Sequence, residues 1–250
     1  MSTPVRVLLV GAAGRMGQAI LRVAERQADL AITGQCELGD SIDHVIGRCD
    51  VVVDFSHPDA TERNCASCME NQKPLVIGTT GQSRAQVGAL DEAAKAIPVL
   101  LAANFSLGVN TLFWLTRKAA ELLGDEFDLE IVETHHRLKK DAPSGTAKRL
   151  AEVLCEARGL NYEKNVRHGR EGLIGERPAN EIGVHSIRAG DVVGDHIVSF
   201  AAAGERLELA HKASSRETFA IGALRAARWI IGKSPGRYSM EDVLGLSGRA

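Results

Sequence analysis

The sequence carries no strong net charge, no even set of cysteines and no long uninterrupted apolar run. Its net charge is −2 over 250 residues, so no global electric field attracts nucleic acid or an anionic membrane. Five cysteines give no disulfide framework in a chain of this size. We therefore expect no nucleic-acid or membrane partner. Any anionic ligand must be held by a local cluster of cations or by backbone amides.

The apolar runs are short or interrupted. The run from Val5 to Val10 is too short for the hydrophobic region of a signal peptide, and no small-residue cleavage site follows it. The longest apolar stretch, 97–115, is broken by Pro98, Asn104, Ser106, Gly108 and Asn110. This stretch is typical of a strand, a loop and a helix start rather than a membrane span. These features predict a cytoplasmic protein.

The sequence also lacks a complete set of metal ligands. Cys65 and Cys68 have redox-motif spacing, but they fall inside a predicted helix, 60–70, away from any strand-to-helix turn. No second cysteine pair completes a zinc site, and the pair His135 and His136 has no evident third ligand. We expect buried thiols and no bound metal.

Strands and helices alternate over the first hundred residues. Such alternation predicts an α/β fold, a Rossmann-type doubly wound parallel sheet with helices on both faces. The apolar, β-branched runs that predict its strands are 5–10, 30–35, 50–54, 74–77 and 98–102.

The pattern changes after Gly108. One helix is expected at 110–123, and a later helix is expected to end at Arg158, with Gly159 as its closing residue. Strands dominate from Ile182 onward. This predicts an inserted α+β domain with a largely open sheet, followed by a last helix that can pack back on the first domain. The predicted boundaries are 1–107 plus 216–250 for a dinucleotide-binding domain and 108–215 for a substrate-binding domain.

A glycine loop follows the first predicted strand and opens the first helix. Its G-x-x-G-x-x-G spacing ends at Gly17. Glycines at these places permit a tight turn and a close approach of the backbone to a pyrophosphate, whose phosphates can then bind the free N–H groups at the helix N-terminus. Glu37 stands about 20 residues later, at the end of the second strand, where a carboxylate can bind the adenosine ribose hydroxyls. Leu38 follows in place of an arginine, so NADH is favoured, while Arg15 in the loop leaves NADPH open.

Loops after the fourth and fifth strands are placed to border the nicotinamide half, because ligands bind outside the carboxyl ends of parallel strands. Phe55 and Ser56, after the third strand, are placed similarly, and ordinary loop structure explains them equally well. The predicted cofactor contacts are Gly11, Ala12, Ala13, Gly14, Arg15, Met16, Glu37, Gly78, Thr79, Thr80, Ala102, Ala103, Asn104 and Phe105.

A charged segment from His135 to Asp141 follows a later strand and leads into a helix. Ser144 is the expected N-cap, which leaves the amides of Gly145 and Thr146 as unpaired donors. A helix N-terminus flanked by histidine and lysine can bind a carboxylate. Spacing alone is also compatible with a solvated surface loop.

These residues carry a resemblance to a known family. The run Glu-Thr-His-His, then Lys139, then Asp-Ala-Pro-Ser-Gly-Thr-Ala closely resembles the signature of the 4-hydroxy-tetrahydrodipicolinate reductases, the dihydrodipicolinate reductases of bacterial lysine and diaminopimelate synthesis. Leu38 departs from the arginine of some members, and the stretch between Glu37 and Asp50 is short compared with several relatives. Further matches at 10–17, 76–81, 103–106, 188–191 and 211–216 extend the resemblance over nearly the whole chain.

The resemblance implies NAD(P)H-dependent reduction of the dianionic dicarboxylate 4-hydroxy-2,3,4,5-tetrahydrodipicolinate to 2,3,4,5-tetrahydrodipicolinate, with loss of water. It implies that His135 is a proton donor or acceptor, Lys139 a proton donor and His136 a substrate contact. Gly145 and Thr146 would bind a substrate carboxylate. Which of His135 and Lys139 delivers the proton stays open. The resemblance also implies a homotetramer built through the sheet of the middle domain, which makes that domain the oligomerisation domain.

Two other functions are compatible with the first domain. Another small Rossmann dehydrogenase, acting on aspartate or homoserine, would share the dinucleotide-binding half and differ in the segment 135–146. A non-catalytic nicotinamide sensor would bind the cofactor without oxidising it.

Overall fold

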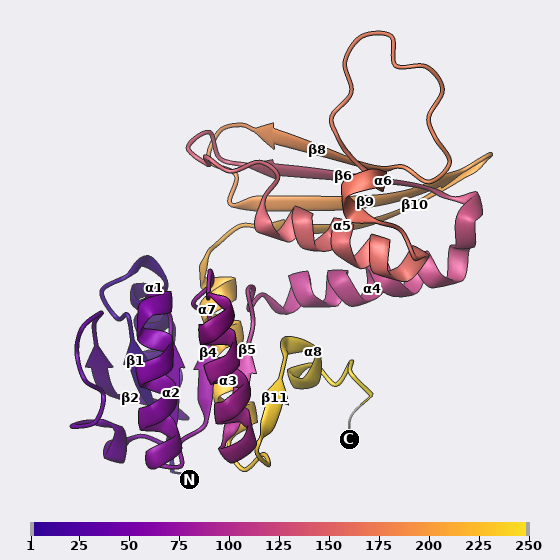
Figure 1. Cartoon of the computed structure of the whole chain (residues 1–250). Helices are drawn as coiled ribbons and strands as arrows, with labels where there is room; N and C mark the ends of the chain where they lie inside the picture. The colour runs from indigo at the N-terminus through magenta and orange to yellow at the C-terminus, as the bar shows by residue number, and fades with distance from the viewer. Residues whose placement is uncertain (1–2, 249–250) are drawn as a thin grey trace. The chain divides into compact units, whose positions relative to one another are not determined.

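The chain folds into two compact units, which a computed structural model describes over residues 3–248 (Figure 1). The first unit holds the chain up to Leu107 and resumes at Glu217, and the second spans Gly108–Arg216. The functional roles expected for the two parts of the chain stay predictions. The outermost residues of the predicted first domain, 1–2 and 249–250, lie outside the described residues.

The first unit is built on a six-stranded sheet with the order β11-β5-β4-β3-β1-β2, and every pairing in it is parallel. Because β1 lies between β2 and β3, the order of the strands reverses direction beside β1, where ligands bind outside the carboxyl ends. The strands are β1 (Val5–Val10), β2 (Leu30–Cys36), β3 (Val51–Asp54), β4 (Leu75–Ile77), β5 (Pro98–Leu101) and β11 (Gly236–Tyr238).

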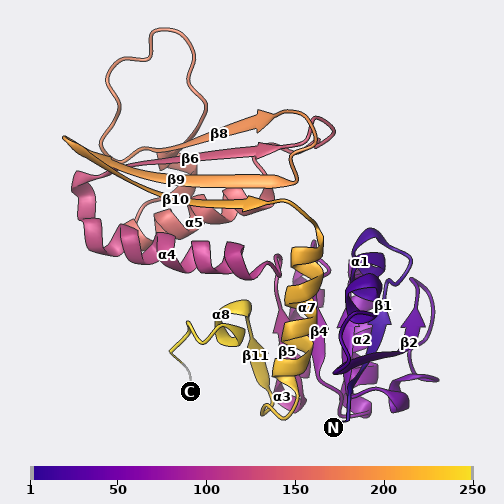
Figure 2. The same ribbon diagram turned by 180° about the vertical axis from the view of Figure 1, so that it is seen from behind.

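Helices cover both faces of this sheet, as alternating side chains along β1 require. Val7 and Leu9 pack on one face with α1 (Arg15–Ala24), α7 (Glu217–Ile230) and α8 (Met240–Val243), the face seen in Figure 2. Leu8 and Val10 pack on the other face with α2 (Thr61–Glu70) and α3 (Arg84–Ala96). Short 3-10 turns lie at Ile46–Arg48 and Pro58–Ala60. The predicted fold class is confirmed.

The second unit is a five-stranded mixed sheet with the order β10-β9-β6-β8-β7. Its helices α4 (Leu107–Leu123) and α5 (Gly145–Arg158) lie together on one face (Figure 1), where Ile131 and Phe200 of the sheet pack against Leu154. The remaining elements are β6 (Asp128–His135), α6 (Tyr162–Asn165), β7 (Val166–His168), β8 (Ile182–Arg188), β9 (Gly194–Ala202), β10 (Glu205–Ala213) and a 3-10 turn at Gly124–Glu126.

One expectation was wrong, and four short elements were not expected. His135 was expected in a loop, but β6 extends through it, because its backbone pairs with Arg188 of β8. The elements α6, β7, α8 and β11 were not expected, because segments of three or four residues carry no readable periodicity. The predicted end of α5 at Gly159 is confirmed, with φ of 63° in the left-handed region. Among residues 3–248, no helix is long and apolar enough to cross a membrane.

Candidate active site

The glycine loop between β1 and α1 is shaped by backbone contacts that exclude side chains. Gly11 has φ of +83°, and a Cβ there would lie 2.5 Å from the carbonyl oxygen of Phe55. A Cβ on Gly17 would lie 2.2 Å from the carbonyl oxygen of Gly11. These contacts hold the loop close to α1 and leave Ala13, Gly14 and Arg15 exposed at the helix N-terminus. Such a loop fits a dinucleotide pyrophosphate.

Glu37 follows β2 and turns toward this loop. Its Oε1 accepts a hydrogen bond from the backbone N–H of Ala13 at 2.6 Å, and its own N–H donates to Asp40 at 2.7 Å. The exposed carboxylate is therefore held beside the loop, as expected for a group that binds ribose hydroxyls.

The other predicted cofactor segments also lie at the carboxyl edge of this sheet. Gly78, Thr79 and Thr80 follow β4, and Ala102–Phe105 follows β5. Phe55 packs against Phe105, with ring centroids 5.3 Å apart, and fills the space above Gly78. Phe105 is buried and Phe55 is half-buried, at the edge where a nicotinamide ring would bind.

Asp54, which the sequence did not single out, joins the loops of this edge. The side chain is fully buried at the end of β3. Its Oδ1 accepts hydrogen bonds from Ser56 Oγ at 2.6 Å and Thr79 Oγ1 at 3.1 Å, and its Oδ2 accepts one from Asn64 at 2.8 Å. Ser56 therefore has a structural partner in this loop.

In the second unit, the end of β6 carries a buried ionic cluster. Glu133 is fully buried, and its Oε2 lies 2.5 Å from Nδ1 of His135. Arg188 of β8 donates to both oxygens of Glu133, at 2.8 and 2.9 Å. Burial would raise the pKa of Glu133, but its hydrogen bonds, first among them the one from Arg188, outweigh burial and hold the pKa at about 2.

A second buried histidine lies beside this cluster. His196 of β9 meets the ring of His135 edge-on, with centroids 5.2 Å apart, and its Nε2 lies 3.1 Å from Oγ of Ser144. Burial lowers the pKa of His196 to about 4. Burial also lowers the pKa of His135, although Glu133 acts in the opposite direction. Burial therefore favours the neutral form of both rings.

The charged segment after β6 divides into half-buried and exposed cations. Lys139 is half-buried, and its Nζ lies 2.9 Å from Oδ1 of Asp141, which lowers the pKa of that carboxyl. Arg137 and Lys140 are exposed. Nε2 of His136 lies 3.4 Å from Nη2 of Arg216. Lys139 and His136 are therefore held in place, whereas the two exposed cations extend into solvent.

The first turn of α5 completes the arrangement. Ser144 caps the helix as predicted, with its Oγ accepting a hydrogen bond from the N–H of Ala147. Gly145 is exposed and Thr146 is half-buried at this N-terminus. The structure thus brings His135, Lys139 and the start of α5 into one part of the second unit.

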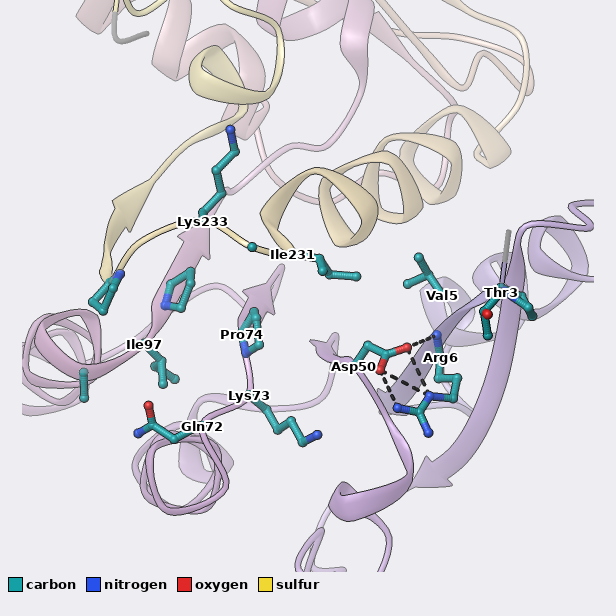
Figure 3. A pocket seen from close by; sticks show the side chains of 15 residues that line it. Thr3, Val5, Arg6, Asp50, Gln72, Lys73, Pro74, Ile97, Ile231 and Lys233 are labelled. Atoms are coloured by element: carbon teal, nitrogen blue, oxygen red, sulfur yellow. Dashed lines mark hydrogen bonds and ion pairs between the residues drawn. The ribbon is translucent and has the colours of Figure 1, made fainter. Parts of the chain in front are cut away.

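A separate cavity of about 640 Å³ lies at the opposite, amino edge of the first sheet (Figure 3). Three of its polar side chains are already engaged: Arg6 donates to both oxygens of Asp50, and Lys73 donates to the carbonyl oxygen of Cys49. Lys233 lies over the ring of Trp229. The cavity is therefore not the predicted nucleotide site, which lies at the carboxyl edge.

The thiol expectation is confirmed by the structure. All five cysteines are free and buried, and burial raises the pKa of Cys65 to about 12. Within residues 3–248, no cluster of three or more histidine, cysteine or acidic side chains is arranged to hold a metal ion.

Comparison with known proteins decides the family. Models of the dihydrodipicolinate reductase N-terminus and C-terminus match residues 5–105 and 108–244. The chain is 54% identical over 243 residues to a 4-hydroxy-tetrahydrodipicolinate reductase of Akkermansia muciniphila, covering 97% of this chain and 99% of the relative. The chain belongs to the dihydrodipicolinate reductase family. A second relative so named, from Syntrophotalea carbinolica, is 43% identical over 265 residues, and the match covers 97% of this chain and 99% of that relative.

A solved structure shows the same fold. The dipicolinate-bound dihydrodipicolinate reductase from Paenisporosarcina sp. TG-14 has a TM-score of 0.76 and 23% identity, covering 95% of this chain and 98% of that one. The predicted family and enzyme class are confirmed: the chain is a nicotinamide-dinucleotide-dependent reductase of this family. The comparisons support neither the sensor nor the aspartate or homoserine dehydrogenase alternative.

Sequence reasoning missed the partners that surround the candidate residues. Glu133 and His135 are two residues apart on a strand, so their side chains share one face, and this signal was available. Arg188 and His196 reach Glu133 and His135 only through the order β9-β6-β8. No local pattern in the sequence states that order.

Proposed function

We propose that this chain reduces 4-hydroxy-tetrahydrodipicolinate to tetrahydrodipicolinate, with loss of water, using a nicotinamide dinucleotide. The observation that carries the proposal is the cluster of His135, Lys139 and the N-terminus of α5 in one chain with a glycine loop that fits a pyrophosphate. The names of the relatives support this substrate. Dipicolinate in the Paenisporosarcina protein supports a small dianionic dicarboxylate as the ligand.

The residues divide the work of the reaction. The bound nicotinamide supplies a hydride. The amides of Gly145 and Thr146, at the positive end of α5, hold one carboxylate, with His136 as a further contact. The atom next to the reduced carbon must gain a proton, and His135 and Lys139 are the groups within the cluster that can handle it. Cations and helix N–H groups also stabilise charge that develops during the reaction.

Two lysine variants test the assignment. Lys139→Met removes the proposed proton donor, and Lys140→Met removes the exposed cation next to it. The assay follows NADH absorbance with the cyclic product of aspartate semialdehyde and pyruvate. We expect Lys139→Met to lower kcat by about 10²- to 10⁴-fold, with an unchanged Kd for NADH, and Lys140→Met to retain kcat. An unchanged kcat in Lys139→Met contradicts the role, and no turnover by the parent protein contradicts the proposed reaction.

NADH is the proposed cofactor of choice. The carboxylate of Glu37 is held beside the glycine loop by the N–H of Ala13, where it favours ribose hydroxyls and repels a 2′-phosphate. Arg15 is exposed in the same loop and offers the one cation there for NADPH. Steady-state kinetics with both cofactors side by side tests this choice: a higher kcat/KM for NADPH would contradict it.

A homotetramer is the proposed assembly. In the second unit, α4 and α5 pack on one face of the sheet, while Val132, Ile187 and Ile197 alternate onto the other face. Ile187 is 46% exposed, so this face offers apolar area for contact between copies. Light scattering with size-exclusion chromatography measures the mass, and a monomer at micromolar concentration contradicts the proposal.

A further inference from the structure

Glu133 connects three segments that the proposed function needs. Its Oε2 faces Nδ1 of His135 at 2.5 Å, and its Oε1 accepts a hydrogen bond from the backbone N–H of Ser144 at 3.2 Å, where α5 begins. Arg188 binds both of its oxygens. A fully buried carboxylate with this many donors stays ionised across the physiological pH range.

The ionised carboxylate determines which nitrogen of His135 carries hydrogen. A carboxylate without a proton only accepts hydrogen bonds, so Nδ1 of His135 must be the donor in this pair. The neutral ring then holds its lone pair at Nε2. A Cβ at position 194 would lie 3.0 Å from that Nε2, and the glycine there leaves the space beside it open.

Arg188 also connects Glu133 to the segment that carries Lys139. Besides Glu133, its Nη2 donates to the carbonyl oxygen of Asp141 at 2.6 Å. The side chain of Asp141 in turn pairs with Lys139. The position of Lys139 therefore depends on the same arginine that neutralises Glu133.

We propose that Glu133, held by Arg188, is a positioning residue that fixes His135 as the Nδ1–H tautomer and ties this ring to the Lys139 segment and to the start of α5. The role of His135 in this inference rests on the proposed function, but its tautomer can be measured without substrate. A neutral His135 so held accepts through Nε2 and has no proton to release there. Lys139 is then the remaining donor near neutral pH.

The other charged groups around His135 leave this assignment unchanged. The segment after β6 contributes Lys139 and Asp141, β8 contributes Arg188, and β9 contributes His196. Lys139 and Arg188 disfavour a second proton on His135, as burial does. The neighbouring His211 of β10 acts on His196 in the same direction.

Nitrogen NMR of the full-length protein, labelled with ¹⁵N at histidine, tests the tautomer. A His135→Gln variant identifies the two ring signals of His135 by their loss. In the parent protein we expect a protonated Nδ1 and an unprotonated Nε2 at pH 7.5. In Glu133→Gln the new amide can donate to Nδ1, so the Nε2–H tautomer becomes populated.

A matched control comes from the same strand. Glu130 lies on the opposite face of β6 and binds Arg170 and His185, at 3.0 and 2.9 Å. Like Glu133, it is a carboxylate held by an arginine and a histidine, with its pKa held at about 2 against the effect of burial. Glu130→Gln removes a comparable charge and is expected to leave the His135 signals unchanged.

A double variant guards against loss of the fold. Glu133→Gln alone leaves Arg188 without its carboxylate, whereas Glu133→Gln with Arg188→Met removes both charges of the buried pair. In both variants we expect a mixed tautomer and a kcat lowered by about 10²-fold, with the KM for NADH unchanged. In Glu133→Gln, the limb of the pH profile that reports His135 should move to lower pH, because the carboxylate favours the protonated ring.

The outcomes separate this inference from the proposed function. An Nε2–H tautomer in the parent protein, or an unchanged Nδ1–H tautomer in both Glu133 variants, overturns the positioning role. The expected tautomers in proteins that never turn over the substrate support the positioning role and overturn the proposed reaction.

Discussion

Replacement of Gly17 by alanine tests the shape of the cofactor loop directly. The added Cβ would lie 2.2 Å from the carbonyl oxygen of Gly11 and 2.5 Å from that of Ala12. Both are backbone atoms of the loop itself, so no side-chain rotation relieves the contact. Overpacking of this kind typically costs about 1–3 kcal/mol, because the backbone must shift to relieve it.

The same energy sets the expected loss of affinity. If the loop must return to its parent shape to bind NADH, 1–3 kcal/mol corresponds to an increase in Kd of about 5- to 140-fold. Gly88→Ala is the matched control. Gly88 is exposed within α3, and a Cβ there meets nothing within 4 Å. Alanine at this position should stabilise the protein by about 0.5–1 kcal/mol.

Fluorescence titration with NADH and differential scanning calorimetry measure the two effects. We expect Gly17→Ala to weaken NADH binding and lower Tm, and Gly88→Ala to retain affinity and raise Tm by a few degrees. Affinity within twofold of the parent in Gly17→Ala, together with an unchanged Tm, would refute the role of this close contact.

Three further predictions concern cofactor choice, packing and acid stability. Glu37→Ala should lower kcat/KM for NADH about tenfold, the value of one or two lost hydrogen bonds, and raise it for NADPH in steady-state kinetics, because the carboxylate no longer repels the 2′-phosphate; equal losses with both would contradict the ribose contact. Leu154 of α5 is fully buried against the second sheet, so Leu154→Ala should lower the free energy of unfolding, measured with denaturant, by about 2–5 kcal/mol without changing NADH affinity. The folded-state pKa values of Glu133 and His196, about 2 and about 4, lie below their ordinary values of 4.5 and 6.5; the unfolded chain therefore binds more protons, and stability should fall as pH drops from about 6.5 to 2. Urea unfolding across this range measures the slope, and a flat profile would contradict the assignment.

Much of the fold could be predicted because burial and periodicity agree over long segments. The strands of the first unit are buried on both faces, so they appear as continuous apolar runs such as Val51–Val53. The helix α5 could be placed at both ends, because Ser144 and Gly159 are residues typical of caps. The short strand β11 lacked this support: it lies at the edge of the sheet beside β5 and contains Gly236 and Arg237.

The candidate site was predicted in its local parts and missed in its long-range ones. His135, Lys139 and Ser144 fall within one contiguous motif, so the sequence alone brings them near one another. Arg188 and His196 meet that motif only because two distant strands flank β6. Strand order follows from packing of the whole unit, and a single sequence does not encode it locally.

The interruption of the first unit has a consequence for synthesis on the ribosome. One face of its sheet is covered by α7, whose Ala223, Leu224 and Ala227 are fully buried. Before it can make α7, the ribosome must add the roughly 110 residues of the second unit. At about 5–20 residues per second, that face stays without α7 for roughly 5 to 20 s. The contiguous second unit can fold earlier, so the part of the nascent chain that most needs a chaperone is the half that emerges first.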